Sequence, residues 1–180
     1  MRKKEETLFL YGEKFDEKKA KEFFDEFFRG ESARATAILG HTYLEKLLKE
    51  LLKKRLVKNE PLFKDIDNLN FKRCTNLCYL TGIIIKEERE DLIEINWIRN
   101  EFAHEITINN FNKKEIKDKC KGLFIAEYLR KLSNPKSFPF NTAKNIYTSG
   151  ISSYMVFLNM RLLSCKRIKE RKRYQLKNQE

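Results

Sequence analysis

The chain has 180 residues, and 41% of them are hydrophobic, with phenylalanine alone present 14 times, so it is long enough and apolar enough to fold around a core. Its 6 glycines and 3 prolines are too few for the many turns of an all-β fold. The net charge of +12 favours nucleic acid, an acidic protein or a membrane surface as partner, although a lysine-rich surface without such a role would carry the same charge.

The cysteines and the apolar runs indicate the redox state and the compartment in which we expect the protein. Cys74 and Cys78 lie four positions apart, and no second Cys or His pair follows at the spacing of a zinc site. We therefore expect reduced thiols in a cytoplasmic protein, with no metal and no cofactor. The N-terminus lacks the apolar core of a signal peptide, and the run GISSYMVFLNMRLLSC is too short and too polar to cross a bilayer, so no membrane is expected as partner.

Helical periodicity dominates the chain after an extended lead-in or short strand over residues 1–15. Asp16 is a candidate N-cap of the first helix, and Gly30 is a candidate stop. Pro61 marks a loop, and Gly82 should end the helix that follows it. The expected helices cover residues 16–30, 31–57, 71–84, 86–106, 113–132 and about 141–176.

This pattern predicts an all-α fold, a single helical-bundle domain of about six helices over residues 16–165. The leucines of the second helix form its core face: Leu44, Leu47, Leu48, Leu51 and Leu52. Residues 166–180 carry seven Lys or Arg against two Glu, which predicts a basic C-terminal helical extension. Such an extension is either a solvated helix end or an arm that binds nucleic acid.

An arginine stands on the apolar face of the helix predicted over residues 86–106. Arg99 shares one stripe with Leu92, Ile95, Phe102 and Ile106. Because an unpaired buried charge is costly, Arg99 needs a partner. A carboxylate across the bundle, such as Glu31, is one solution, and a bound phosphate is another, since a guanidinium donates two parallel hydrogen bonds to either group.

Asn100 and His104 lie four apart on the neighbouring stripe with Trp97, so their side chains can touch and the amide can orient the imidazole. Arg99 and His104 diverge by roughly 140° around the helix, so they can flank one cleft, and a two-fold pairing of this helix with its copy would bring two of each together. A structural interpretation stays open, with Arg99 paired in the core and His104 capping the helix. His41 is interpreted as a core histidine.

The stretch RNEFAH at 99–104 fits the R-N-x-x-x-H pattern of the HEPN superfamily. Residues of about 23–125 resemble the MltR family of mannitol operon repressor-like proteins, through E-S-x-R at a helix start, L-F after a loop proline, LTGII and IRNxFAH. The resemblance implies a compact all-α domain that dimerises. In active HEPN members, the Arg and His of two subunits form a metal-independent ribonuclease site. His41 departs from the alanine run often found in these relatives.

The resemblance leaves the function divided. As a HEPN-type RNA endonuclease, the toxin or effector of a defence or toxin–antitoxin module, the chain would use His104 as general base or acid, Arg99 to stabilise the phosphorane and Asn100 to orient His104 or contact the phosphate. Its partners would be RNA, a second copy of the chain, and an antitoxin or regulatory protein.

As a non-catalytic MltR-like transcriptional regulator or protein-interaction module, the chain would use Arg99 and His104 as a structural or ligand-binding cluster. Glu31 and Arg34 would lie near that cluster, and together with Trp97 they are the expected substrate-binding or supporting residues in either case. A third interpretation is a binding partner of a nucleotidyltransferase, a class of enzyme with which HEPN-like helical domains pair.

Overall fold

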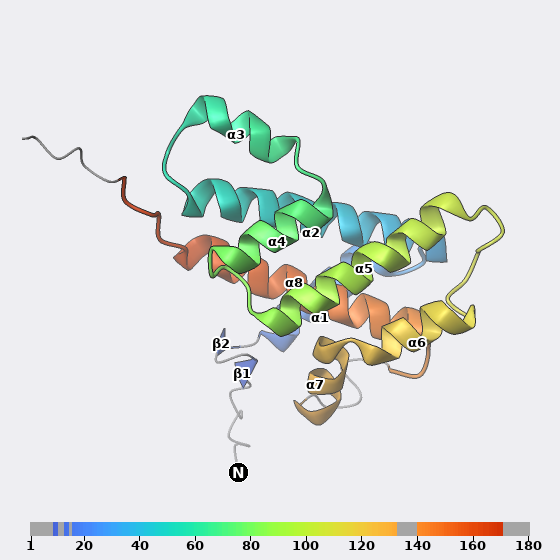
Figure 1. Ribbon diagram of the computed structural model, residues 1–180. Coiled ribbons are helices and arrows are strands. Elements are labelled where there is room, and N and C mark those ends of the chain that lie inside the picture. The colour runs from blue at the N-terminus through green and yellow to red at the C-terminus, as the bar shows by residue number, and fades with distance from the viewer. Residues whose placement is uncertain (1–8, 11–12, 15, 133–139, 171–180) are drawn as a thin grey trace, which may run out of the picture.

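The computed structural model describes residues 9–10, 13–14, 16–132 and 140–170. Over this part of the chain it confirms the all-α class, with eight helices where about six were predicted (Figure 1). A short antiparallel pair of strands, β1 (Phe9–Leu10) and β2 (Glu13–Lys14), precedes them. The helices are α1 (Glu17–Phe28), α2 (Ala33–Arg55), α3 (Glu60–Asp67), α4 (Phe71–Leu80), α5 (Lys86–His104), α6 (Lys114–Gly122), α7 (Phe124–Leu132) and α8 (Ala143–Ser164).

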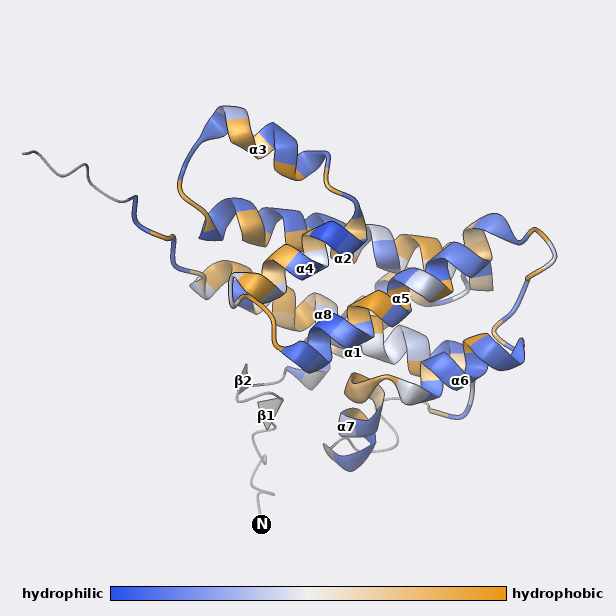
Figure 2. Ribbon diagram, in the orientation of Figure 1, coloured by the Kyte–Doolittle hydropathy of each residue, from blue (hydrophilic) through white to orange (hydrophobic). Residues whose placement is uncertain are grey.

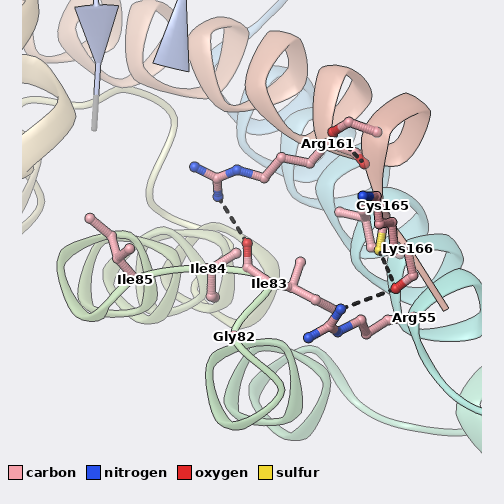
Figure 3. Close-up of a pocket in the computed structure, with 10 residues that line it drawn as sticks. Arg55, Gly82, Ile83, Ile84, Ile85, Arg161, Cys165 and Lys166 are labelled. Carbon is pink, nitrogen blue, oxygen red and sulfur yellow. Dashed lines mark hydrogen bonds between the residues drawn. The ribbon is translucent and has the colours of Figure 1, made fainter. Parts of the chain in front are cut away.

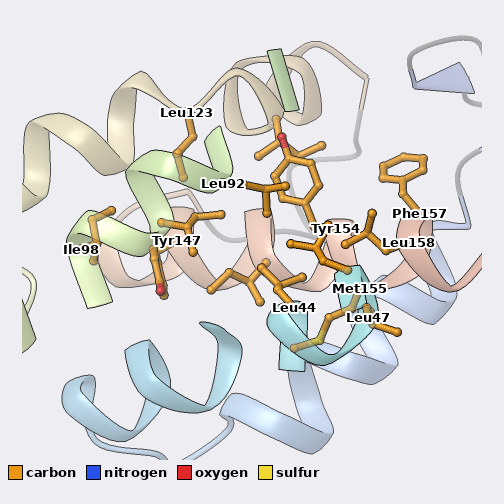
Figure 4. Packing of buried hydrophobic residues seen from close by; sticks show 14 of the residues in the cluster. Leu44, Leu47, Leu92, Ile98, Leu123, Tyr147, Tyr154, Met155, Phe157 and Leu158 are labelled. Carbon is orange, nitrogen blue, oxygen red and sulfur yellow. The ribbon is translucent and has the colours of Figure 1, made fainter. Parts of the chain in front are cut away.

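Helix α8 forms the centre of the domain. Every residue from Ile146 to Leu158 is buried, which is typical of a helix covered on all sides. Helices α1, α2, α6 and α7 pack against it. Figure 4 shows its aromatic side chains among leucines of α2 and α5, and Figure 2 shows hydrophilic residues gathered on α6 and at the start of α5. The predicted leucine face of α2 is buried as expected.

The predicted ends of α1 and α4 are confirmed by their caps. The Asp16 carboxylate accepts a hydrogen bond from the backbone N–H of Lys19 at 3.0 Å, which makes Asp16 the N-cap of α1. Gly30 and Gly82 follow the two helices with φ of 81° and 69°. Glycine adopts this left-handed conformation without the steric cost that other residues meet, which is why both helices end there.

The prediction of an unbroken loop around Pro61 is wrong. Asn59 caps the short helix α3 by accepting a hydrogen bond from the backbone N–H of Leu62 at 3.3 Å. Pro61 stands in the first turn of that helix, where a missing N–H removes no intrahelical hydrogen bond. The proline therefore marks a helix start here rather than a break.

The single helix predicted over residues 113–132 is also wrong, because Leu123 adopts an extended conformation and separates α6 from α7. The carboxylate of Asp91, on α5, accepts hydrogen bonds from the backbone N–H groups of Phe124 at 2.8 Å and Ile125 at 2.9 Å. Tyr154 of α8 donates to the same carboxylate at 2.7 Å. A buried side chain far away in the sequence thus starts α7.

The predicted C-terminal helical extension is not helical over residues 166–170, because α8 ends at Ser164. This segment instead lies against the end of α2, where the backbone N–H of Ile168 donates to the carbonyl of Arg55 at 2.7 Å. Arg167 donates to the carbonyl of Leu56 at 3.0 Å. Residues 171–180, and all of the predicted lead-in except β1 and β2, lie outside the described residues. Within those residues, no helix is both long and apolar enough to span a bilayer.

Replacing Asp91 with Ala should lower the free energy of unfolding by about 3 kcal/mol, because the substitution leaves the N–H groups that start α7 and the Tyr154 hydroxyl without an acceptor. Urea denaturation at neutral pH measures this loss, and amide exchange at Phe124 and Ile125 localises it. Asp118→Ala, which removes an exposed carboxylate from α6, is the matched control. Equal stability of the two variants would contradict this role.

The same carboxyl should give the stability of the protein a pH dependence. Burial raises the pKa of Asp91 from 3.8 to about 6, against the opposing effect of its three hydrogen bonds. Between these two values the folded protein binds more protons than the unfolded chain, so the Asp91 contribution to the free energy of unfolding falls as pH rises from 3.8 to about 6. Urea denaturation across this range should show the decline in the wild type and a weaker one in Asp91→Ala.

Candidate functional site

Arg99 and Asn100 line a surface cleft of about 420 Å³ between α2, α4 and α5. Helix α2 contributes two side chains, the start of α4 contributes two residues and its N-cap, and α5 contributes the rest. The lining residues are His41, Glu45, Asn70, Phe71, Lys72, Asn96, Arg99 and Asn100. The cleft therefore joins two residues of the predicted site to groups from helices that the sequence motif does not include.

Arg99 is half-buried and has no carboxylate partner among the described residues. Its Nη1 donates a hydrogen bond to Oδ1 of Asn100 at 3.0 Å, and its Nε is buried without any partner. The alternative in which Arg99 pairs with Glu31 is wrong. Glu31 is exposed, and its backbone carbonyl accepts a hydrogen bond from Lys144. The positive charge of Arg99 is left to face the cleft without a neutralising side chain.

The interpretation of His41 as a core histidine is confirmed, yet His41 also lines the cleft. Its side chain is 4% exposed, its Nε2 lies 2.9 Å from Oδ1 of Asn96, and its ring stacks on Phe71 at 4.1 Å between centroids. Burial lowers the pKa of His41 below its ordinary 6.5, and the Arg99 guanidinium adds to that shift. The hydrogen bond to Asn96 and the charge of Glu45 oppose it. The imidazole is therefore held neutral at neutral pH.

His104 is the last residue of α5 and is exposed, as its predicted place near a helix end implies. It does not line the cleft, and no hydrogen bond joins it to Asn100, whose Oδ1 accepts from Arg99. Within the described residues the imidazole of His104 has no hydrogen-bond partner. The structure thus brings Arg99 and Asn100 together and leaves His104 at the surface, beyond the end of the cleft.

Arg34 fixes the C-terminal end of α5. Its guanidinium donates to the carbonyl oxygens of Phe102, of Glu105 at 2.9 Å, of Ile106 at 3.1 Å and of Ile108 at 3.1 Å. The last carbonyls of a helix have no partner within it, so Arg34 caps α5 and holds the loop that follows. Its role is supporting, because it lies outside the cleft lining.

Trp97 takes part in packing rather than in the cleft. Its ring is partly buried against the core, and the ammonium of Lys119 on α6 lies 4.7 Å from the ring centroid. Lys119 also pairs with Glu94 of α5. These contacts attach α6 to α5. Trp97 was predicted to support the site, but in the structure it contributes to helix packing alone.

A second cleft, of about 290 Å³, lies where α2, the loop after α4 and the end of α8 meet (Figure 3). Its two arginines are engaged by the protein. Arg161 donates to the carboxylate of Glu88 at 2.6 Å and to the carbonyl of Ile83 at 3.2 Å. Arg55 donates to the carbonyls of Thr81 and Lys166. These bonds join chain segments, so the second cleft has the character of a structural junction.

Comparisons with protein-family models, with curated proteins and with solved structures find no match to this chain. A functional assignment therefore depends on the chemistry of the residues themselves, above all on the cleft that contains Arg99.

Replacing Arg34 with Ala should loosen the end of α5, because the carbonyls it caps lose a charged donor. We expect the free energy of unfolding to fall by about 2 kcal/mol and amide exchange over residues 104–108 to accelerate. Arg73→Ala, which removes an exposed arginine from α4, is the control. Unchanged exchange at the end of α5 would contradict the capping role.

The lowered pKa of His41 predicts acid sensitivity. The unfolded chain takes up a proton near pH 6.5, whereas the folded protein does so only at lower pH, so the His41 contribution to stability is lost as pH falls below 6.5. An NMR titration checks this directly, since the chain has 2 histidines and a His104→Ala variant assigns them. A His41 midpoint at or above 6.5 would show that its surroundings do not disfavour the charged form.

Proposed function

We propose that this protein is a metal-independent RNA endonuclease of the HEPN type, acting as a homodimer in a defence or toxin–antitoxin role. The observation that carries the proposal is the half-buried charge of Arg99, which faces a cleft and has no carboxylate partner among the described residues. A guanidinium left free in this way suits a phosphate, to which it donates two parallel hydrogen bonds. The net charge of +12 adds long-range attraction for RNA.

The reaction needs an acid–base group and a charge-stabilising group around one phosphodiester. In the proposed reaction, a base removes the proton of the ribose 2′-OH, the 2′ oxygen attacks phosphorus, and the bond from phosphorus to the 5′ oxygen breaks. An acid protonates that leaving oxygen, so the products are a 2′,3′-cyclic phosphate and a 5′-OH. His104 serves as base or acid, and Arg99 donates to the phosphorane oxygens.

The placement of these two side chains favours a dimeric site. Arg99 faces the cleft, while His104 stands exposed at the end of α5 and does not line it. A two-fold axis beside α5 would set Arg99 of one copy against His104 of the other. Asn100 then positions Arg99 through the 3.0 Å hydrogen bond, rather than orienting His104 as the spacing suggested.

A second candidate is a non-catalytic MltR-like regulator or protein-interaction module. Two observations favour it. Arg34, which belongs to the same pattern of resemblance, caps α5 instead of serving the cleft, and His104 has no orienting partner among the described residues. In this function the Arg99 cleft would bind a regulatory ligand, and His104 would contact a partner without cleaving RNA.

Incubation of the purified protein with total tRNA in excess EDTA separates the two candidates. The endonuclease should cleave, and Arg99→Ala and His104→Ala should each lower the rate by roughly a hundredfold or more. Lys64→Ala, which removes an exposed charge from α3, should cleave like the wild type. The new 3′ ends should carry a cyclic phosphate. Absence of cleavage by a folded, dimeric wild type would refute the endonuclease and leave the regulator.

A further inference from the structure

The cleft presents amide donors that the protein itself does not use. Three asparagines line it, and the Oδ1 of each already accepts a hydrogen bond: Asn70 from the backbone N–H of Arg73 at 2.9 Å, Asn100 from Arg99 at 3.0 Å, and Asn96 from the ring of His41 at 2.9 Å. Backbone amides and guanidinium groups only donate, which fixes the orientation of Asn70 and Asn100. Among the described residues, none of the three amide nitrogens has an acceptor.

The third of these amides, that of Asn96, faces His41 through its oxygen. Because Nε2 faces Oδ1 of Asn96, the proton of the neutral imidazole belongs on Nε2, and the amide nitrogen of Asn96 is turned away from the ring. The stack against Phe71 and the burial of the ring hold His41 in this position. This contact joins α2 to α5 at the wall of the cleft.

The charges around the cleft are positive on balance. Lys72 is exposed and, like Arg99, has no ion pair within the described part of the chain. Glu45 is the one carboxylate in the lining, and Lys49 pairs with it at 2.7 Å, which neutralises it. The first residues of α4 also lie here, at the positive end of that helix. The cleft therefore offers hydrogen-bond donors and positive charge, and almost all of its side-chain acceptors are already used within the protein.

The two arginines of the second cleft differ from Arg99 in their partners. Arg55 and Arg161 already donate to carbonyls and to a buried carboxylate, so a ligand would have to break bonds that join α2, α5 and α8. The donors around Arg99 hold no such bonds beyond those within the cleft. The two arginines of the second cleft are thus committed to the fold, whereas Arg99 in the first cleft bonds only its neighbour Asn100.

We infer that the cleft is a binding site for a phosphate ester, formed by Lys72 of α4 and the Asn96 and Asn100 amides of α5 beside Arg99. A phosphate group presents only acceptor oxygens and a negative charge, which matches this lining. The volume of about 420 Å³ suits one nucleotide unit. This inference rests on the proposed function for the choice of RNA as the source of the phosphate. Binding of the phosphate does not itself require that the RNA be cleaved.

The test uses the full chain and an RNA oligonucleotide whose 2′ positions are methylated, so that it cannot be cleaved. Calorimetric titration should show binding by the wild type. Asn96→Asp keeps the shape and the acceptor for His41 but replaces the amide donors with a negative charge, and it should weaken binding by about tenfold. Lys72→Ala should weaken it about fivefold. Lys64→Ala, with the same loss of charge on α3, should bind like the wild type.

Competition identifies the group that is recognised. Displacement of the oligonucleotide by inorganic phosphate supports the site as a receptor for the phosphate alone, and displacement only by uridine 5′-monophosphate supports it as a nucleotide site. Binding by Asn96→Asp and Lys72→Ala at the wild-type affinity, or no binding by the wild type, overturns the inference. Because the methylated RNA cannot be cleaved, the two proposals can fail separately. If the protein binds this RNA but does not cleave tRNA, only the endonuclease proposal is refuted. If it cleaves tRNA but Asn96→Asp and Lys72→Ala bind the methylated RNA like the wild type, only the phosphate site is refuted.

Discussion

The polar anchoring of α5 is the constraint on which the candidate site depends. At its start, Glu88 is buried and accepts hydrogen bonds from Arg161 of α8 and from the backbone N–H of Ile85. One turn later Asp91 starts α7 and receives the Tyr154 hydroxyl, and Arg34 of α2 caps the far end. Buried charges are retained where each has a partner, and these partners come from α2, α7 and α8. They fix the rotation of α5 and so the direction in which Arg99 points.

Arg99 is half-buried on this helix, no opposite charge among the described residues matches it, and its Nε has no partner there. An unpaired guanidinium with a buried Nε lowers stability, and a nearby asparagine compensates for only part of that cost. Exceptions to full pairing gather at functional sites, where a ligand completes the set. The donor-rich lining from Asn70, Lys72 and Asn96 agrees with an anionic ligand, and the RNA cleavage that we propose would involve both this cleft and the exposed His104.

Sequence periodicity was enough to predict the elements that are determined by contacts between residues close together in the sequence. The leucine face of α2, the Asp16 cap and the Gly82 stop involve contacts within a few positions. The break before Phe124 was missed because its cap, Asp91, lies on another helix, and the end of α8 was missed because residues 166–170 bind the end of α2. Arg99 and Asn100 were predicted as site residues, but the helical spacing paired Asn100 with His104 rather than with Arg99. The cleft was not predicted, since packing brings in Asn70, Lys72 and His41, and the one hint was a histidine on an apolar stripe.

Giving Arg99 a carboxylate partner within the protein would test the central claim most directly. Asn100→Asp changes no side-chain shape, places a negative charge at the atom that Arg99 already contacts at 3.0 Å, and should leave the protein at least as stable in urea as the wild type. If Arg99 is kept free to receive a phosphate, this variant should bind the methylated RNA about tenfold more weakly, as measured by titration calorimetry. Binding at the wild-type affinity would contradict the account and make Arg99 a structural residue.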